Sequence, residues 1–205
     1  MQFDLKWLAW EITRSCNLKC VHCRSSSELE VESHSDISRK KAFQVLDEIA
    51  SFARPVIVLS GGEPFLHKDV FEIAQYGTKK GFRMCLATNG TFITPEVCEK
   101  IIFSGIKVVS LSLDGSNAKI HDDFRCQPGA FQATINGAKM LKQHKIDFLI
   151  NSSFTKRNQH DLVGCFQLAK KIGAMAWYPF MVIPIGRGEE LLEEIISQGL
   201  FMTRN

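Results

Sequence analysis

The chain has 205 residues, of which 45% are hydrophobic and 23% charged, and its formal net charge is +3 at pH 7. This length and composition are sufficient for the core of one compact α/β domain, which we expect to span residues 1–205 with no second domain. The small net charge and the lack of a Lys/Arg tract argue against nucleic acid as a partner, and the lack of a signal peptide or of an apolar run of roughly 18 residues favours a cytoplasmic protein that contacts no membrane.

Apolar, β-branched stretches alternate with amphipathic stretches along the chain. The predicted strands cover residues 8–13, 56–59, 83–87, 108–113, 148–151 and 175–182. The predicted helices cover residues 39–52, 70–80, 95–103, 131–144, 160–172 and 189–197. Six successive strand-helix units predict a parallel sheet with right-handed crossovers, in the form of a partial (β/α)6 TIM-like barrel.

Three cysteines follow the first predicted strand. Cys16, Cys20 and Cys23 have the spacing C-x₃-C-x₂-C. Three thiolates on one loop can bind three irons of a [4Fe–4S] cluster and leave the fourth iron free for a small molecule. A structural zinc site that uses His22 and His34 is an alternative, but a second ligand pair at zinc-finger spacing is missing.

Four further cysteines are scattered along the chain. The total of seven is odd, and no export signal is present, so a disulfide framework is not expected. We expect Cys85, Cys98 and Cys165 to be buried thiols, while Cys126 lies in a polar stretch predicted to be a loop.

Polar motifs end the next predicted strands: residues 60–64 (Ser-Gly-Gly-Glu-Pro), 88–90 (Thr-Asn-Gly), 112–115 (Ser-Leu-Asp-Gly) and 151–153 (Asn-Ser-Ser). Because ligands bind at the carboxyl ends of parallel strands, we expect these motifs to share one site with the cysteines. Gly61 and Gly62 would let the backbone approach a ligand, and Pro64 would stiffen the turn.

The same motifs suit S-adenosylmethionine, whose amino and carboxylate groups can chelate an open iron. Glu63 would accept a hydrogen bond from its ammonium group. Thr88, Asn89 and Ser112 suit the ribose hydroxyls or the methionine carboxylate. Asp114 could do the same, or it could be part of an ordinary Asp-Gly turn.

Taken together and in this order, the motifs resemble the radical S-adenosylmethionine superfamily over nearly the whole chain. The resemblance implies a [4Fe–4S] cluster on the three cysteines and S-adenosylmethionine as cofactors. It also implies reductive cleavage of the sulfonium to a 5′-deoxyadenosyl radical, with a one-electron donor such as ferredoxin or flavodoxin. The implied cofactor-binding residues are Gly61, Gly62, Glu63, Thr88, Asn89, Ser112 and Asn151.

Residues 7–24, 121–125 and 183–188 resemble the branch of that superfamily in alternative haem and haem d₁ biosynthesis, of the didecarboxysiroheme deacetylase type. This resemblance implies a siroheme-derived tetrapyrrole as substrate. Arg125 and Arg187, both expected on loops, could bind its carboxylates. A peptide-maturation enzyme and a non-catalytic iron–sulfur module are the alternatives.

The sequence departs from that branch in two respects. Its members usually continue into a cysteine-rich segment with an auxiliary cluster, whereas this chain ends at Asn205 without a cysteine after Cys165. Cys126 stands where the branch usually has glycine. The remaining aromatic and histidine residues carry simple expectations: His22 packs over the adenine or the cluster edge, Trp7 and Trp10 belong to the core, and His67, His144 and His160 are solvated.

Overall fold

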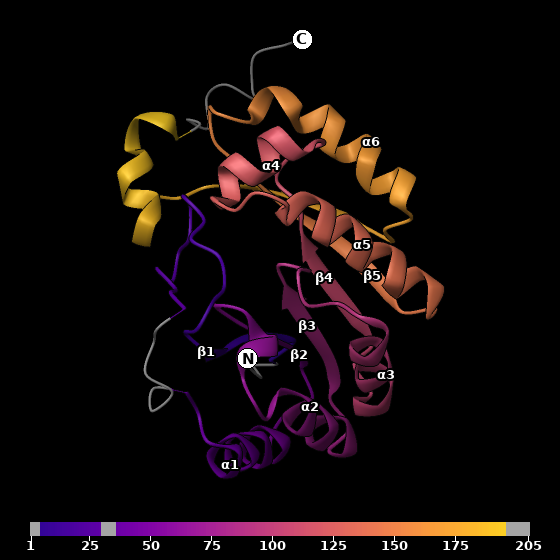
Figure 1. The fold of residues 1–205 in the computed structure, drawn as a ribbon. Coiled ribbons are helices and arrows are strands. Elements are labelled where there is room, and N and C mark those ends of the chain that lie inside the picture. The colour runs from indigo at the N-terminus through magenta and orange to yellow at the C-terminus, as the bar shows by residue number, and fades with distance from the viewer. Residues whose placement is uncertain (1–4, 30–35, 196–205) are drawn as a thin grey trace.

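The computed structural model describes residues 5–29 and 36–195, and a six-stranded sheet lies at its centre (Figure 1). The strands are β1 (Trp7–Thr13), β2 (Val56–Gly61), β3 (Arg83–Thr88), β4 (Val108–Ser112), β5 (Asp147–Phe154) and β6 (Trp177–Met181). Neighbouring strands are parallel and follow chain order. The expected six-stranded parallel α/β sheet is therefore confirmed. Because β1 and β6 do not pair within the described part of the chain, the barrel is open.

The helices connect successive strands. They are α1 (Arg39–Ala50), α2 (Val70–Lys79), α3 (Pro95–Ser104), α4 (Ala118–Arg125), α5 (Ala130–Gln143) and α6 (Leu162–Ile172), with the short 3-10 helices η2 (Pro64–Leu66), η3 (Gln159–Asp161) and η4 (Gly186–Glu194). Local sequence explains their ends. In α3, for example, the Thr94 side chain accepts a hydrogen bond from the Val97 N–H, and Gly105 ends the helix in the left-handed conformation.

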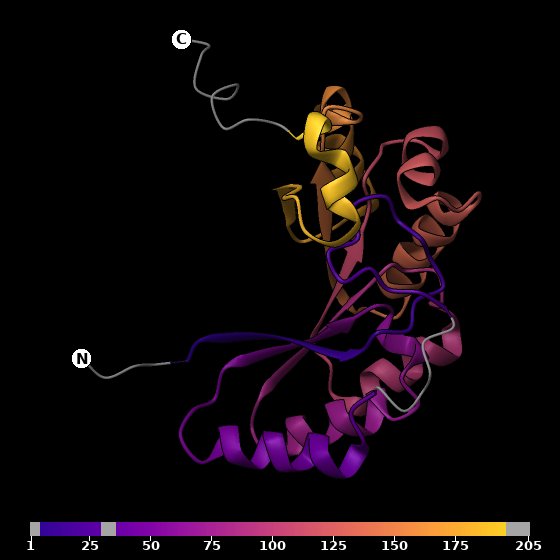
Figure 2. The ribbon, with the colours of Figure 1, turned by 90° about the vertical axis from the view of Figure 1, so that its left-hand side faces the viewer.

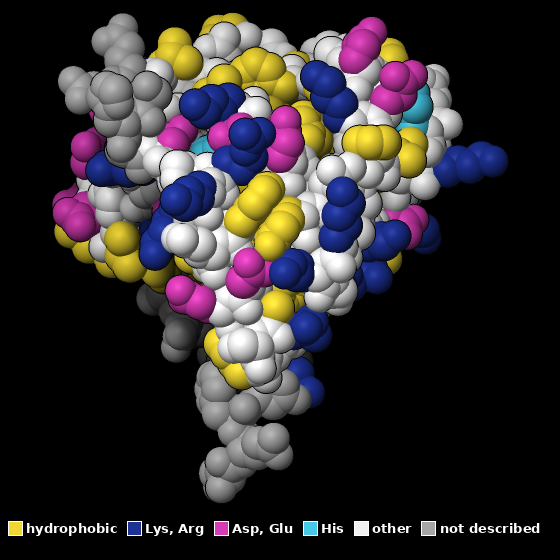
Figure 3. All heavy atoms as spheres, turned by 90° about the horizontal axis from the view of Figure 1, so that it is seen from below, with side chains coloured by type: hydrophobic (Ala, Val, Ile, Leu, Met, Phe, Trp, Pro, Cys, Tyr) yellow, Lys and Arg dark blue, Asp and Glu magenta, His cyan; other side chains and the backbone are white. Residues whose placement is uncertain are grey.

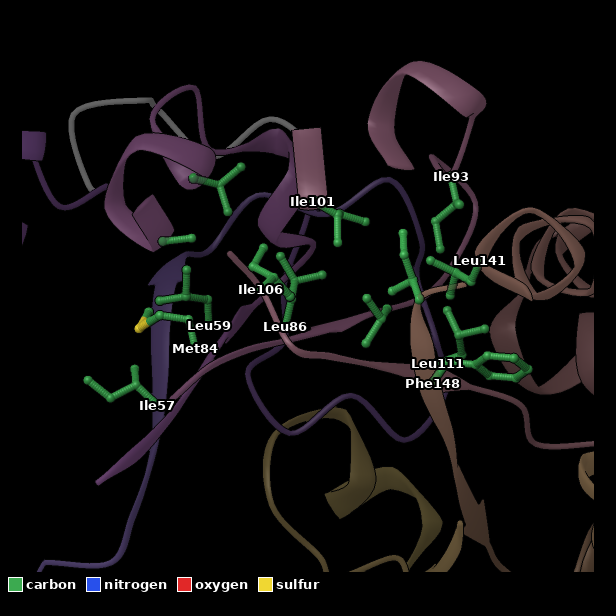
Figure 4. Close-up of a cluster of buried hydrophobic side chains, with 14 of the residues drawn as sticks. Ile57, Leu59, Met84, Leu86, Ile93, Ile101, Ile106, Leu111, Leu141 and Phe148 are labelled. Atoms are coloured by element: carbon green, nitrogen blue, oxygen red, sulfur yellow. The ribbon is translucent and has the colours of Figure 1, made fainter. Parts of the chain in front are cut away.

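The hydrophobic core lies between the sheet and the helices on one of its faces. Figure 2 shows α1, α2 and α3 along that side of the strands, and Figure 4 shows Ile57, Leu59 and Met84 among the buried side chains. Alternation along the strands decides which residues enter this core. In β2, Ile57 and Leu59 are fully buried, whereas Val56 and Val58 point to the opposite, concave face.

Several expectations about single residues are wrong. Trp7 is 58% exposed and lies on the concave face, whereas Trp10 packs against the core as expected. His67 is buried because its ring contacts the Ile37 carbonyl and accepts a hydrogen bond from the Asp69 N–H. His34 lies outside the described residues.

Two helix predictions need correction. Arg125, expected on a loop, is the last residue of α4, which forms because Asn117 caps its first turn and His121, Phe124 and Arg125 pack inward. The helix expected at residues 189–197 is the 3-10 helix η4 as far as the structure describes it, and residues 196–197 lie outside the described range.

The surface agrees with the small net charge. On the face seen from below Figure 1, Lys and Arg side chains are interspersed with Asp and Glu (Figure 3). None of the helices in residues 5–29 and 36–195 is sufficiently long and apolar to span a bilayer.

Candidate cofactor site

A cavity of about 610 Å³ lies at the carboxyl ends of the strands. Its size is within the range of cavities that bind cofactors. The expected site residues that line it are Cys16, Cys20, Cys23, Gly61, Gly62, Thr88, Asn89, Ser112 and Asn151. Of the implied cluster-binding and cofactor-binding residues only Glu63 is absent from this lining, and Arg187, expected to bind a substrate, is absent as well. Segments far apart in sequence thus meet at one site, as the parallel topology predicts.

The three cysteines have different environments within the loop that follows β1. Cys16 and Cys20 are buried and Cys23 is half-buried. The Cys16 sulfur accepts a hydrogen bond from the Leu18 N–H at 3.4 Å. Burial raises the pKa of Cys16 to about 11 and also raises the pKa of Cys20. In the free chain these thiols are therefore protonated at neutral pH, and binding of a metal would release their protons.

Gly61, the last residue of β2, and Gly62 make room for the start of the cysteine loop. The Gly62 N–H donates to the Thr13 carbonyl at 2.9 Å, and the Glu63 N–H donates to the Ser15 carbonyl at 2.8 Å. A Cβ on Gly61 would overlap the Thr13 carbonyl, and one on Gly62 would overlap the Ser15 carbonyl. The glycines therefore serve the packing of the chain's own backbone, in addition to lining the cavity.

Glu63 faces the protein interior, which differs from its expected direct contact with a ligand. It is fully buried. Its carboxylate accepts hydrogen bonds from the Thr88 hydroxyl at 2.8 Å, the Asn89 N–H at 2.9 Å and the Phe65 N–H at 3.3 Å. Burial raises the pKa of Glu63 to about 7, against the opposing effect of these donors. Glu63 thus joins the ends of β2 and β3 behind the cavity wall.

Arg125 on α4 lines the cavity and contacts the cysteine loop. The residue is 8% exposed, and its Nε lies 2.6 Å from Asp114 Oδ2. Its Nη1 donates to the Cys20 sulfur at 3.6 Å. The backbone of the same helix contributes the Phe124 carbonyl, which accepts from the Val21 N–H at 3.2 Å. Arg125 is therefore not a loop arginine, and its guanidinium is engaged within the protein.

Arg187 on η4 holds the cysteine loop from the other side. Its Nε donates to the Cys20 carbonyl at 2.9 Å and its Nη1 to the Ser27 carbonyl at 3.1 Å. The Arg187 backbone N–H also donates to the Cys23 carbonyl at 3.0 Å. Figure 1 shows η4, in yellow, beside this indigo loop. Arg187 is therefore occupied in shaping the loop, instead of extending toward a substrate.

His22 and Cys126 have clear local explanations. The His22 ring stacks on Phe124, with centroids 4.4 Å apart, and lines the cavity. Burial lowers the pKa of His22 to about 4, so the ring is neutral at pH 7. Cys126 is exposed at the end of α4 with φ of 53°. Glycine would adopt this left-handed conformation at less cost than cysteine.

The site residues that the sequence does not indicate come from the end of β6 and the segment after it. Phe180, Met181 and Ile183 line the cavity together with the cysteines. The predicted strand at residues 175–182 covers Phe180 and Met181, but no pattern in it indicates a ligand. The contact of Arg125 with Asp114 has no signal in the sequence, because the two residues lie on different elements.

The donor set fits an iron–sulfur cluster. Three free thiols border one cavity, and all seven cysteines are free. Within residues 5–29 and 36–195, no three His, Cys, Asp or Glu side chains are already grouped as ligands of a metal ion. A cubane binds each thiolate to a different iron, so its ligands stand further apart than those of a mononuclear zinc ion.

Residues 10–169 match the Radical SAM superfamily. The chain therefore belongs to the radical S-adenosylmethionine superfamily, whose cofactors are a [4Fe–4S] cluster and S-adenosylmethionine. The structure of Streptococcus suis SuiB bound to S-adenosylmethionine has the same fold. The TM-score is 0.73 at 17% identity, over 96% of this chain and 44% of that chain.

Curated relatives point to one branch of the superfamily. An AdoMet-dependent heme synthase of Methanosarcina barkeri is 46% identical over 183 residues, which is 89% of this chain and 52% of that protein. An AdoMet-dependent heme synthase of Nitratidesulfovibrio vulgaris is 40% identical over 192 residues, which is 94% of this chain and 52% of that protein. These relatives confirm the resemblance to the haem biosynthesis branch. The chain spans about half the length of the curated relatives it matches.

Proposed function

We propose that this chain is the catalytic core of a radical S-adenosylmethionine enzyme that modifies a siroheme-derived tetrapyrrole. The observation that supports it best is the cavity bordered by Cys16, Cys20 and Cys23 together with the expected cofactor residues. When bound, the cluster and S-adenosylmethionine supply a 5′-deoxyadenosyl radical for hydrogen abstraction.

The roles of the chain's own residues follow from their positions. Cys16, Cys20 and Cys23 are the proposed ligands of the cluster. Gly61 and Gly62 would offer backbone groups to the methionine part of S-adenosylmethionine. Thr88, Asn89, Ser112 and Asn151, which line the floor of the cavity, would bind its ribose and carboxylate through short polar side chains. Glu63 would act indirectly, because its hydrogen bonds fix Thr88 and Asn89.

A second cavity offers room for the flat ring of a substrate. It measures about 690 Å³ on the concave face of the sheet. Trp7, Val58 and Tyr178 line it, while Phe180 and Asn151 line both cavities. A tetrapyrrole ring placed there would lie next to the cofactor. The relatives named as heme synthases support this substrate class.

We further propose a reduced electron carrier such as ferredoxin or flavodoxin as partner, and the cytoplasm as the location. A reducing compartment suits a chain whose seven cysteines are all free thiols. The half-buried Cys23 marks the side of the loop through which an electron would reach the cluster with the least intervening protein.

Reconstitution under anaerobic conditions tests the cofactor part of the proposal. The wild-type chain should bind about four iron and four sulfide per chain and, with dithionite, form 5′-deoxyadenosine from S-adenosylmethionine. Alanine in place of Cys16, Cys20 or Cys23 should abolish both. Cys126→Ala is the matched control, because this thiol is exposed and does not line the cavity. A stable zinc protein without iron would contradict the proposal.

Tyr178→Ala tests the substrate part. Tyr178 is 50% exposed on the concave face, so its removal takes away a ring surface with little loss of core packing. Binding of iron didecarboxysiroheme should weaken about tenfold to a hundredfold, with the cluster content unchanged. Phe103→Ala, on the outer surface of α3 and 79% exposed, is the control. Modification of a peptide, with no binding of the tetrapyrrole, would overturn this substrate assignment.

A further inference from the structure

Arg125 contacts one of the three cysteine sulfurs and lies in the protein interior. Burying an arginine costs free energy unless its charge is paired, so a buried guanidinium needs an acidic partner. Asp114, which is fully buried, provides that partner at 2.6 Å. The pair brings a guanidinium N–H to the Cys20 sulfur, with 3.6 Å between nitrogen and sulfur.

Asp114 is itself held on several sides, so the position of Arg125 is well defined. The Ser153 N–H donates to Asp114 Oδ1 at 2.7 Å, and the Asp114 N–H donates to His121 Nδ1 at 3.1 Å. The Asn158 side chain donates to the Asp114 carbonyl at 2.9 Å. Ser153 of β5 therefore holds the carboxylate, while His121 of α4 and Asn158 before η3 hold the backbone of Asp114, and the carboxylate in turn holds the guanidinium.

The sulfurs of Cys16 and Cys20 accept hydrogen bonds from different kinds of donor. Cys16 accepts from a backbone N–H on its own loop, at Leu18. Cys20 accepts from a cationic side chain that is 105 residues away in sequence. Arg187 of η4 also packs on the loop, but it contacts the backbone carbonyls of Cys20 and Ser27 and not a sulfur. Arg125 is therefore the arginine of this pair whose side chain contacts a sulfur.

We propose that Arg125 is a positioning residue that sets the reduction potential of the cluster through a charge-assisted N–H hydrogen bond to the Cys20 thiolate. This inference rests on the proposed function, because it requires the cluster on Cys20. Hydrogen bonds and positive charge at a thiolate ligand stabilise the reduced, more negative cluster and raise its potential. Arg125 thus makes the cluster easier to reduce by a weak physiological donor.

The central experiment compares Arg125→Lys with Arg39→Lys in the anaerobically reconstituted chain. Both substitutions keep the positive charge and remove a planar guanidinium, but only the first removes the guanidinium donor at the sulfur, because Arg39 is exposed at the start of α1 and does not line the cavity. In Arg125→Lys the equilibrium constant for one-electron reduction should fall about tenfold, which corresponds to about 59 mV. In Arg39→Lys the potential should stay at the wild-type value. Equal potentials in the wild-type protein and Arg125→Lys would overturn the inference.

A spectroscopic measurement keeps the test independent of how well Arg125→Lys folds. In Arg187→Lys protein with ¹⁵N-guanidino arginine, pulsed EPR of the reduced cluster should show ¹⁵N coupling, because Arg125 remains. The absence of this coupling would overturn the inference even if Arg125→Lys binds no cluster. The double variant D114N/R125M removes the ion pair without leaving an unpaired buried charge, and it should show a lowered potential as well.

The failure of this inference differs from the failure of the proposed function. A wild-type chain that binds no cluster contradicts both. A wild-type chain that binds the cluster and cleaves S-adenosylmethionine, but has the same potential as Arg125→Lys, contradicts the role of Arg125 alone.

Discussion

At the scale of single residues, the shape of the cavity depends on polar groups behind its wall as well as on those that line it. Glu63 illustrates this, because its oxygens accept from donors of β3, η2 and the residue after β3, and they do not reach the cavity. A carboxylate with three donors is well hydrogen-bonded, but at this depth it is poorly solvated. Burial dominates, and the pKa of Glu63 is raised to about 7.

Glu63 should make the stability of the chain depend on pH. Its pKa of about 7 in the folded chain lies above its ordinary value of 4.5. Its contribution to stability is therefore fully present below about pH 4.5 and is lost as the pH rises through about 7. In Glu63→Gln, the decrease of the free energy of unfolding between about pH 4.5 and 8 should be smaller by roughly 1–3 kcal/mol. Denaturant unfolding at several pH values measures the slope for both proteins.

The comparison concerns the slope and not the absolute stability. The amide introduced by Glu63→Gln would bring an N–H group toward existing donors and so destabilise the fold at every pH. Glu48→Gln, on the exposed surface of α1, is the matched control. Identical slopes in the wild-type chain and Glu63→Gln would show that Glu63 stays ionised in the folded protein.

At the scale of elements, the cysteine loop is shaped by segments that pack on it from three directions. The turn after β2 supports its start through Gly62 and Glu63, α4 contacts its middle, and η4 covers its end. Gly186 lies where η4 begins, with φ of 61°, and a Cβ there would overlap the carbonyl oxygens of Cys23 and Arg24.

Gly186→Ala should therefore displace η4 from the cysteine loop. We expect faster amide hydrogen exchange in residues 16–28 and lower retention of the cluster. Gly129→Ala is a close control, because Gly129 also has a positive φ, of 86°, but nothing lies within 4 Å of its Cβ position. Both variants have the left-handed strain of about 1–2 kcal/mol, and only Gly186→Ala has the overlap. Equal protection of the loop in the two variants would contradict this explanation.

At the scale of the whole molecule, the sequence was sufficient for the sheet and for most of the cavity. The strands are short apolar stretches of β-branched residues, and their parallel order places the residues after them at one edge, so Cys16, Gly61, Thr88 and Ser112 could be grouped in advance. Asn151, expected at the end of a strand, lies within β5 beside Ser112, because the strand continues to Phe154.

The contacts that hold the cysteine loop could not be predicted in the same way. The helix α4 was missed because charged residues such as Lys119, Asp122 and Asp123 interrupt its apolar pattern. The buried ion pair of Asp114 and Arg125 joins two elements through side chains that ordinarily face solvent. Arg187 resembled a substrate contact for the same reason, since a loop arginine and a structural one look alike in sequence.

The long reach of the contacts to the cysteine loop has a consequence for biosynthesis. Arg125 is 105 residues from Cys20, and Arg187 is 167 residues from the carbonyl that it contacts. A nascent chain that emerges from the ribosome from its N-terminus exposes all three thiols long before either arginine has been translated. Until residue 187 has emerged, the loop lacks its last support. We therefore expect delivery of iron and sulfide to follow translation of this region, and a chain stalled before Arg187 to carry cysteines that are more open to oxidation.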